Sequence, residues 1–284
     1  FAMRAVERLR GRTEVIASGL LDRLEGQGRA PVDIVETYCA LLPVTVIAEI
    51  LGVPESERER VLAFGAAAAP SLDLGLGWKH YREVQAALAG FDDWLGVHLE
   101  SLRNSPGDDL LSQLVAARDE GVGLTELELK STAGLVLAAG FETTVNLRSN
   151  GIALPATHRD QLALLRDDTL GATRATVVEE VLRFDPPVLL TGREAARDTE
   201  VAGCRIAEGS IVTTLLWGAN CDPEVFDDPH TFDVTRSNAR EHISFSSGRH
   251  HCLGAALARM EGEVGLRAVF DRFPDLVVEP GGTR

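Results

Sequence analysis

The chain has 284 residues, 45% hydrophobic and 25% charged, which describes an ordinary globular protein long enough to bury a core. A formal net charge of −15 argues against general binding of nucleic acid or of an anionic membrane, and no apolar run reaches the roughly 18 residues of a membrane-spanning helix. The cysteines stand far apart with no C-x-x-C pair, which excludes a zinc-finger pattern and a disulfide framework and predicts a reducing, cytoplasmic compartment: Cys39, Cys204, Cys221 and Cys252.

The first part of the chain shows helical periodicity and little else. Apolar residues at helical spacing predict five helices, at residues 1–26, 32–51, 54–69, 78–103 and 109–120. Glycine and proline separate them, as at Gly52 and Pro54. Because no repeat, low-complexity tract or linker interrupts the pattern, this part predicts a mainly α protein.

A longer helix is predicted from Glu126 to Leu154, about 43 Å if straight. Thr125 and Glu128 have the spacing of a capping box at its start. Pro155 lacks the N–H of a helix interior, so we expect the helix to kink or end near Leu154.

The middle of this helix carries the sequence Ala-Gly-Phe-Glu-Thr-Thr at residues 139–144. Gly140 weakens the helix and a threonine hydroxyl competes for a backbone carbonyl, which predicts a local opening or bend. An acid beside an alcohol at such an opening, here Glu142 and Thr143, could deliver protons from solvent to a buried oxygen species. A solvated glutamate beside two ordinary threonines is the alternative.

A short helix at residues 176–184 carries Glu180 and Arg183. Their i, i+3 spacing puts both on one face, within reach of a salt bridge, although a surface pair is the more common origin of this pattern. Asp185 and the two prolines after it then force extended chain.

The next section changes from helical to β texture. Short β-branched segments at residues 199–216, cut by glycines, predict a small antiparallel β unit. Arg193, just before it, is either solvated or paired with a carboxylate. Residues 218–243 are irregular, and so long a connection in a compact domain tends to be functional or held by a ligand.

A cysteine segment then precedes a helix at residues 253–273. Phe245, Gly248, Cys252 and Gly254 have the spacing F-x-x-G-x-x-x-C-x-G. If Cys252 ligates a haem iron, the glycines let the backbone approach a flat macrocycle and Phe245 keeps water from the sulfur. The helix N-terminus favours a thiolate, the ligand that pushes electron density toward O–O cleavage. The alternative is a small buried cysteine at a helix start.

Taken together, these motifs resemble the cytochrome P-450 family of haem-thiolate monooxygenases, in its soluble bacterial branch. Four motifs occur in the family's order and the likeness runs the whole length of the chain: residues 139–144, residues 180–187, residues 220–222 with 229–232, and residues 245–254. The resemblance implies a mainly α fold, as one helix-rich domain over residues 1–284 with a small antiparallel β unit and a long central helix over the haem. It also implies that the family's N-terminal part and last β hairpin are missing.

The resemblance implies a role for each motif residue. Cys252 would be the proximal iron ligand of haem b, iron protoporphyrin IX. Thr143 would hold the oxygen species and Glu142 would take part in the proton relay. Glu180 and Arg183 would be structural, locking the chain before the cysteine. The remaining predicted cofactor contacts are His250 and Arg193 at the haem propionates, together with Phe245, Gly248, Gly254 and Ala139.

The reaction implied is insertion of one oxygen atom from O2 into a small apolar organic substrate. Electrons would come from NAD(P)H through ferredoxin and ferredoxin reductase type partners. From Arg236 to Arg259 there are four arginines and one acid, a basic stretch that could steer an acidic redox partner. Neither a nucleic acid partner nor a membrane segment is expected.

Two departures from the family pattern bear on this interpretation. Thr231 stands where the family usually has an arginine that joins the Glu180–Arg183 pair, so we expect that network to be one member short. Cys221 replaces another common arginine. A degenerate or truncated homologue that binds haem weakly or not at all is therefore the second hypothesis. A haem-thiolate protein that uses peroxide or isomerises its substrate is the third, and the acid–threonine pair argues against it.

Overall fold

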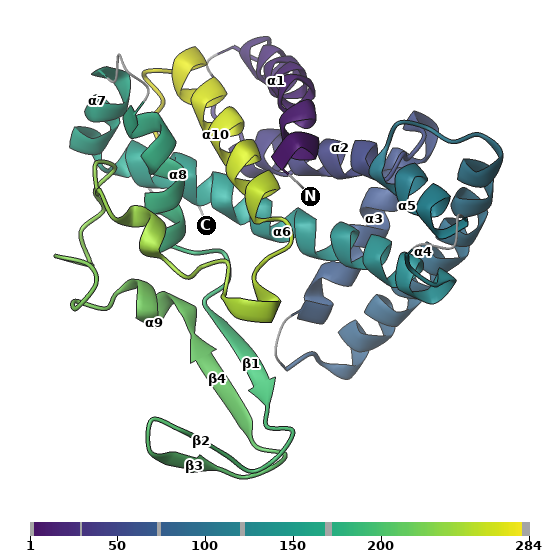
Figure 1. Ribbon diagram of the computed structural model, residues 1–284. Helices are drawn as coiled ribbons and strands as arrows, with labels where there is room; N and C mark the ends of the chain where they lie inside the picture. Colours follow the sequence, from purple (N-terminus) through teal and green to yellow (C-terminus); the bar gives the residue numbers. More distant parts are fainter. Residues whose placement is uncertain (1–2, 29, 73–74, 120–122, 168–171, 280–284) are drawn as a thin grey trace. The chain divides into compact units, whose positions relative to one another are not determined.

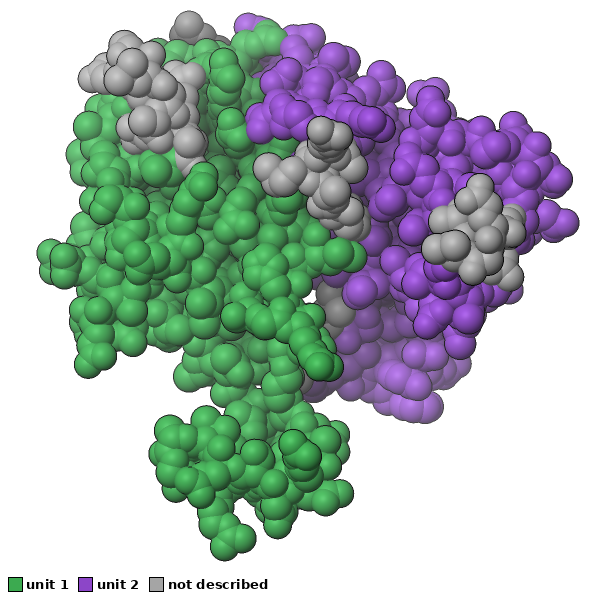
Figure 2. All heavy atoms as spheres, viewed as in Figure 1, with its two compact units in different colours: residues 1–3, 147–284 green, residues 4–146 purple. Residues whose placement is uncertain are grey.

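The computed structural model describes residues 3–28, 30–72, 75–119, 123–167 and 172–279, and most of them are helical (Figure 1). By its internal contacts the chain divides into two compact units. Unit 1 comprises Phe1–Met3 and Leu147–Arg284, and unit 2 comprises Arg4–Asn146 (Figure 2). The single domain over residues 1–284 stays a prediction.

Unit 2 contains the five helices predicted for the first part of the chain. The second predicted helix is split at Ala40, and the third is flanked by short 3-10 turns. The elements are α1 (Met3–Glu25), a π-helical turn (Val35–Cys39), α2 (Leu41–Ile50), 3-10 turns at Glu55–Glu57 and Ala69–Leu72 around α3 (Arg58–Ala68), α4 (Trp78–Asn104), α5 (Leu110–Asp119) and the first part of α6 (Glu126–Thr157).

The capping box at the start of α6 is confirmed. The backbone N–H of Thr125 donates to a carboxylate oxygen of Glu128 at 2.8 Å, and the N–H of Glu128 donates to the Thr125 hydroxyl at 3.3 Å. These reciprocal bonds satisfy two N–H groups that the helix itself leaves open. They explain why so long a helix begins at a defined residue.

The opening expected at Gly140 is wrong, since α6 is uninterrupted there. A Cβ at Gly140 would lie 2.9 Å from the Cδ1 of Ile47, so the glycine serves close packing of α6 on α2 within unit 2. The core around this contact is apolar and spans several helices of the unit. Its buried members include Ile47, Leu95, Leu99, Leu111, Leu129 and Leu137.

Helix α6 does not end at Leu154, which was one of the two outcomes expected there, because it continues through Pro155 to Thr157. The last turn has its own bonds in place of the one that proline cannot make. The His158 N–H donates to the Leu154 carbonyl at 2.9 Å, and the Thr157 hydroxyl donates to the Ala153 carbonyl at 2.8 Å. A proline near a helix end forfeits one bond, which these neighbours offset.

Unit 1 holds the remaining elements, of which α7 and α9 were not predicted. They are the end of α6, α7 (Arg159–Asp167), α8 (Ala172–Phe184), β1 (Leu190–Glu194), β2 (Thr199–Val201), β3 (Cys204–Ile206), β4 (Ile211–Leu215), α9 (Leu216–Asn220), 3-10 turns at Ala239–Glu241 and Gly248–His250, and α10 (Ala255–Arg272).

The antiparallel β structure is confirmed, but it begins earlier than predicted. Strand β1 pairs with β4, with Leu190 opposite Leu215 and Glu194 opposite Ile211, and β2 pairs with β3. Arg193 therefore lies within β1. The sequence interpretation, which placed it before the β structure, was wrong on this point. The two hairpin-like pairs extend from the helical part of unit 1 (Figure 1).

Within unit 1, α10 packs tightly against α6 and α8. A Cβ at Gly151 would lie 2.6 Å from Leu266, and one at Gly262 would lie 3.2 Å from Val178. Arg148 of α6 and Glu261 of α10 form a buried ion pair at 3.2 Å. The helix that follows the cysteine is thus fixed by close contacts. None of the helices in the described ranges is long and apolar enough to cross a membrane.

Candidate functional site

The cysteine segment forms a closed loop between a 3-10 turn and α10. The Cys252 N–H donates to the Phe245 carbonyl at 2.8 Å, and the His251 N–H donates to the Gly248 carbonyl at 3.1 Å. Gly248 has φ +67°, which suits glycine, and Ser246 has φ +59°, a conformation that non-glycine residues rarely adopt. Cys252 thus lies just outside α10, whose N-cap is Gly254.

Burial of the Cys252 sulfur acts against the thiolate form that the sequence predicts. The residue as a whole is exposed and not in a disulfide, but its sulfur is close enough to neighbouring atoms that burial raises the pKa of the thiol. The Gly254 N–H and the charge of Arg259 oppose this rise. Desolvation thus opposes the effect of the helix start, and the thiolate form of Cys252 stays a prediction.

Phe245 lies among charged and aromatic groups. The guanidinium carbon of Arg259 stands 4.5 Å from the centre of its ring, within cation–π distance. The rings of His242 and His251 lie 5.8 and 6.4 Å away, centre to centre. That Phe245 shields the sulfur stays a prediction.

Glu180 and Arg183 form the predicted salt bridge, and both side chains are fully buried. Two bonds join them, at 2.7 and 2.8 Å. The expected gap in this network is wrong, because Arg236 supplies a third member at 3.3 Å from Glu180. Thr231 contributes its backbone carbonyl, which accepts from Arg183 at 3.2 Å and from Arg236 at 3.1 Å. A residue of any type can provide that carbonyl.

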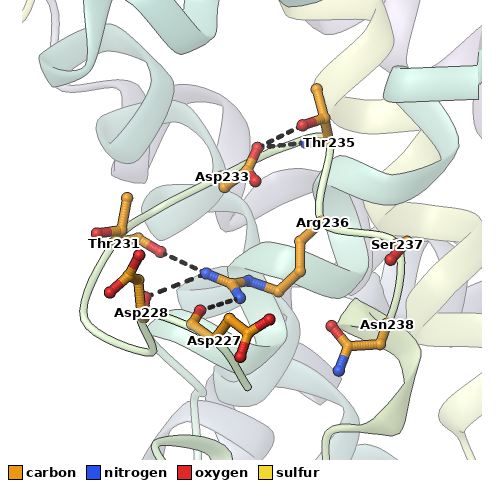
Figure 3. A pocket seen from close by; sticks show the side chains of 8 residues that line it. All are labelled: Asp227, Asp228, Thr231, Asp233, Thr235, Arg236, Ser237 and Asn238. Atoms are coloured by element: carbon orange, nitrogen blue, oxygen red, sulfur yellow. Dashed lines mark hydrogen bonds between the residues drawn. The ribbon is translucent and has the colours of Figure 1, made fainter. Parts of the chain in front are cut away.

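Arg236 also organises the irregular chain before the cysteine. Its guanidinium donates to the carbonyls of Asp227 at 2.6 Å and Asp228 at 3.2 Å, as Figure 3 shows. A polar pocket opens beside it, lined by Asp227, Asp228, Thr231, Asp233, Thr235, Arg236, Ser237 and Asn238. None of the predicted haem contacts lines this pocket. Bonds from the Arg236 side chain account for much of the order in this stretch.

Asn220 extends this anchoring toward the cysteine; it belongs to the motif at residues 220–222, for which the sequence predicted no role. Its side chain accepts from the Ile243 N–H at 2.9 Å and donates to the Ser244 hydroxyl at 2.8 Å. That hydroxyl donates to the Leu182 carbonyl of α8 at 2.6 Å. The signal available in the sequence was an asparagine in a stretch rich in Asp and Pro, and the structure shows that this asparagine is buried.

Glu179 is a second group that the sequence interpretation missed. It is buried on α8 and contacts His242 at 3.0 Å and Arg259 at 2.9 Å. Burial raises its pKa, but the bonds from His242 and Arg259 outweigh burial and hold the pKa below its usual range. The signal available in the sequence was the pair of adjacent carboxylates in the apolar stretch TVVEEVL. A carboxylate that such a stretch buries needs a charged or hydrogen-bonding partner.

The two predicted propionate contacts, His250 and Arg193, are exposed. His250 lies in the 3-10 turn before Cys252, and the Arg193 guanidinium donates to the Gly192 carbonyl at 2.8 Å. Leu189 and Leu253 are 54% and 60% exposed, so apolar surface is available near these groups in the chain. Thiol, apolar and cationic groups of this kind are the chemistry that a flat apolar macrocycle with an iron and two carboxylates requires. The residues of unit 1 therefore fit a haem.

The acid–threonine motif belongs to unit 2. The Thr143 hydroxyl donates to the Ala139 carbonyl at 2.8 Å, and the Thr144 hydroxyl to the Gly140 carbonyl at 2.6 Å, so the predicted competition for carbonyls occurs without breaking the helix. Glu142 is exposed and Thr143 half-buried. That Ala139, Glu142 and Thr143 act at a haem stays a prediction.

The model of the family described as Cytochrome P450 matches residues 70–281. The chain belongs to the cytochrome P450 family. Haem b is the cofactor of this family, and the mainly α fold expected from the resemblance is confirmed. The structure of CYP109E1 from Bacillus megaterium in complex with testosterone superposes with a TM-score of 0.90 at 31% identity, over 100% of this chain and 73% of that one.

Curated relatives agree with this assignment. Putative cytochrome P450 140 of Mycobacterium tuberculosis is 54% identical over 287 residues, which cover 100% of this chain and 65% of the relative. The 6-deoxyerythronolide B hydroxylase of Saccharopolyspora erythraea is 43% identical over 277 residues, covering 97% and 66%. The chain thus spans about two thirds of the length of the cytochromes P450 that it matches.

Proposed function

We propose that this chain provides the haem-thiolate part of a monooxygenase that inserts one atom of O2 into a small apolar organic substrate. The single observation that carries the proposal is the Cys252 loop. It is an ordered, hydrogen-bonded loop with an exposed cysteine residue, in a chain that belongs to the cytochrome P450 family. The other oxygen atom would leave as water.

The residues of the chain would divide the work among binding, positioning and proton transfer. When bound, haem b supplies the activation of O2. Cys252 would hold the iron, while Arg193 and His250 would bind the propionates. Thr143 Oγ1 would pass a proton toward the reacting oxygen, and the exposed Glu142 carboxylate would replenish it from solvent.

The substrate class is supported by the names of relatives. The 6-deoxyerythronolide B hydroxylase of S. erythraea and Polyketide biosynthesis cytochrome P450 PksS of Bacillus subtilis are 43% and 37% identical. CYP109E1 holds testosterone in its structure. An apolar organic molecule, with the polyketide class as the specific case, is the substrate we propose.

Ferredoxin and ferredoxin reductase type partners would deliver electrons from NAD(P)H. The basic stretch around the cysteine is smaller than its sequence indicated, because Arg236 is buried against Glu180. Arg240 and Arg249 remain exposed, and Arg259 is half-exposed. These charges support steering of an acidic donor, which high salt would weaken.

The decisive experiment is the carbon monoxide difference spectrum of the reduced 284-residue chain. A red-shifted Soret band that disappears in Cys252→Ser supports thiolate ligation. Cys204→Ser is the matched control, since Cys204 is another exposed cysteine of unit 1 and should leave the band unchanged. Absence of haem from the parent chain would overturn the proposal in favour of a degenerate homologue with a helical fold.

A further inference from the structure

Glu179 joins the segments on either side of Cys252 through one buried carboxylate. Its Oε2 lies 3.0 Å from Nε2 of His242, before the cysteine, and its Oε1 lies 2.9 Å from Nε of Arg259, after it. The Ser244 N–H donates to Nδ1 of His242 at 3.1 Å, so Nε2 carries the hydrogen and donates to Glu179. The carboxylate thus fixes the positions of both flanks at once.

The adjacent carboxylate, Glu180, has a different task. It binds Arg183 and Arg236 and accepts from the Asp233 N–H at 3.0 Å. These contacts hold the segment of Asp233 and Arg236, which lies well before the cysteine. Glu179 alone of this pair contacts α10. Two neighbouring residues of α8 therefore serve two separate networks, and only one of them reaches the helix that follows Cys252.

Arg259 connects Glu179 to the cysteine loop. Its guanidinium is held on one side by the carboxylate and lies on the other side 4.5 Å from the centre of the Phe245 ring. The carbonyl of Phe245 accepts the N–H of Cys252 at 2.8 Å. A charge-assisted bond and a cation–π contact together restrict a long side chain that is otherwise 35% exposed.

We propose that Glu179 and Arg259 act as a charge pair beside the haem thiolate, in which the positive charge of Arg259 raises the reduction potential of the iron and the negative charge of Glu179 lowers it. This inference rests on the proposed function. Neither residue touches the reacting atoms, so both act through Phe245 and Cys252.

The sign of each effect follows from electrostatics. Reduction adds one negative charge to the iron, so a nearby positive charge favours the reduced state and a nearby negative charge disfavours it. Arg259→Gln should therefore lower the reduction potential. Glu179→Gln keeps the shape and hydrogen-bonding capacity of the side chain but removes its negative charge, and it should raise the potential.

The experiment is a spectroelectrochemical titration of the haem-loaded chain and its variants. We expect shifts of opposite sign in Glu179→Gln and Arg259→Gln, and a potential between them in the double variant. Arg259→Lys keeps the charge and should stay nearer the parent than Arg259→Gln. It also tests the inference if Glu179→Gln fails to fold. Damage to the fold alone would shift both single variants in the same direction.

Arg267→Gln is the matched control, because it removes an exposed arginine from the same helix, where Arg267 pairs with Asp271 at 3.5 Å. Its potential should equal that of the parent. If the parent binds haem and the two single variants shift together or not at all, the inference is overturned while the proposed function stands. If the parent takes up no haem, the inference and the proposed function are both overturned.

Discussion

The guanidinium of Arg236 reaches the carboxylate of Glu180 at 3.3 Å, although 56 positions separate the two residues in the chain. Arg183, on the same helix as Glu180, completes a buried group of one acid and two bases. Each arginine also donates to backbone carbonyls of the irregular segment. A helix residue thereby determines the path of the chain that leads to Cys252.

Loss of Arg236 should therefore be severe. Arg236→Gln removes a buried cation and leaves several carbonyls without donors, which costs about 3–5 kcal/mol of the free energy of unfolding. Urea-induced unfolding measures this difference. Thr231→Ala is the control, because the network uses the Thr231 carbonyl and the side chain is exposed, so its cost should stay within about 0.5 kcal/mol. Equal losses in both variants would contradict the assignment.

The partners in this network differ in how far the sequence could predict them. The Glu180–Arg183 bridge follows from local i, i+3 geometry and was predicted. The contribution of Arg236 depends on how an aperiodic segment folds back, which no local pattern encodes. A family motif suggested position 231 instead. The carbonyl of that residue takes part regardless of its side chain.

The helices likewise differ in how far local sequence patterns predict them. The long α6 was predicted because its capping box and periodicity are local, whereas its continuation past Pro155 depends on bonds made by Thr157 and His158. The nine-residue α7 begins at Arg159, with only His158 between it and the end of α6, so the sequence offered no separate start for it. The cysteine segment was singled out from its four fixed positions, while the role of Glu179 depends on its distant partners.

Glu261 gives a pH dependence that can be tested. Burial raises the pKa of Glu261 to about 7, and the charge of Arg148 opposes this rise. In the unfolded chain the pKa returns to near 4.5, so the unfolded state loses its proton first as pH increases. The stabilisation is therefore fully present below about pH 4.5 and is lost progressively up to about pH 7, by as much as roughly 3 kcal/mol.

The test compares the parent with Glu261→Gln, which cannot titrate. Their difference in unfolding free energy should change between pH 4.5 and 7, with the parent losing stability relative to the variant as pH rises. Any constant cost of leaving Arg148 with a neutral partner cancels in this comparison. A difference that stays flat over this range would show that Glu261 does not titrate as described.

Close packing of α10 on α6 gives a further prediction. A Cβ at Gly151 would lie 2.6 Å from the Cδ1 and 2.8 Å from the Cδ2 of Leu266. Gly151→Ala should cost about 1–3 kcal/mol through overpacking, despite a gain of up to about 1 kcal/mol in helix propensity. At Gly19 of α1 nothing lies within 4 Å of the same added atom, so Gly19→Ala should stabilise the protein. Thermal unfolding of both variants distinguishes packing from propensity.

Thr143 provides the test of the proton relay. Thr143→Ala removes the hydroxyl that the proposed function assigns to proton delivery, so NAD(P)H consumption should continue while product falls and hydrogen peroxide rises. Thr132→Ala is the matched control, because the Thr132 hydroxyl donates to the Glu128 carbonyl at 2.7 Å in the same helix, as Thr143 does to Ala139 at 2.8 Å. Its ratio of product to NAD(P)H consumed should equal that of the parent. If Thr143→Ala also keeps the parent ratio, Thr143 is not part of the relay.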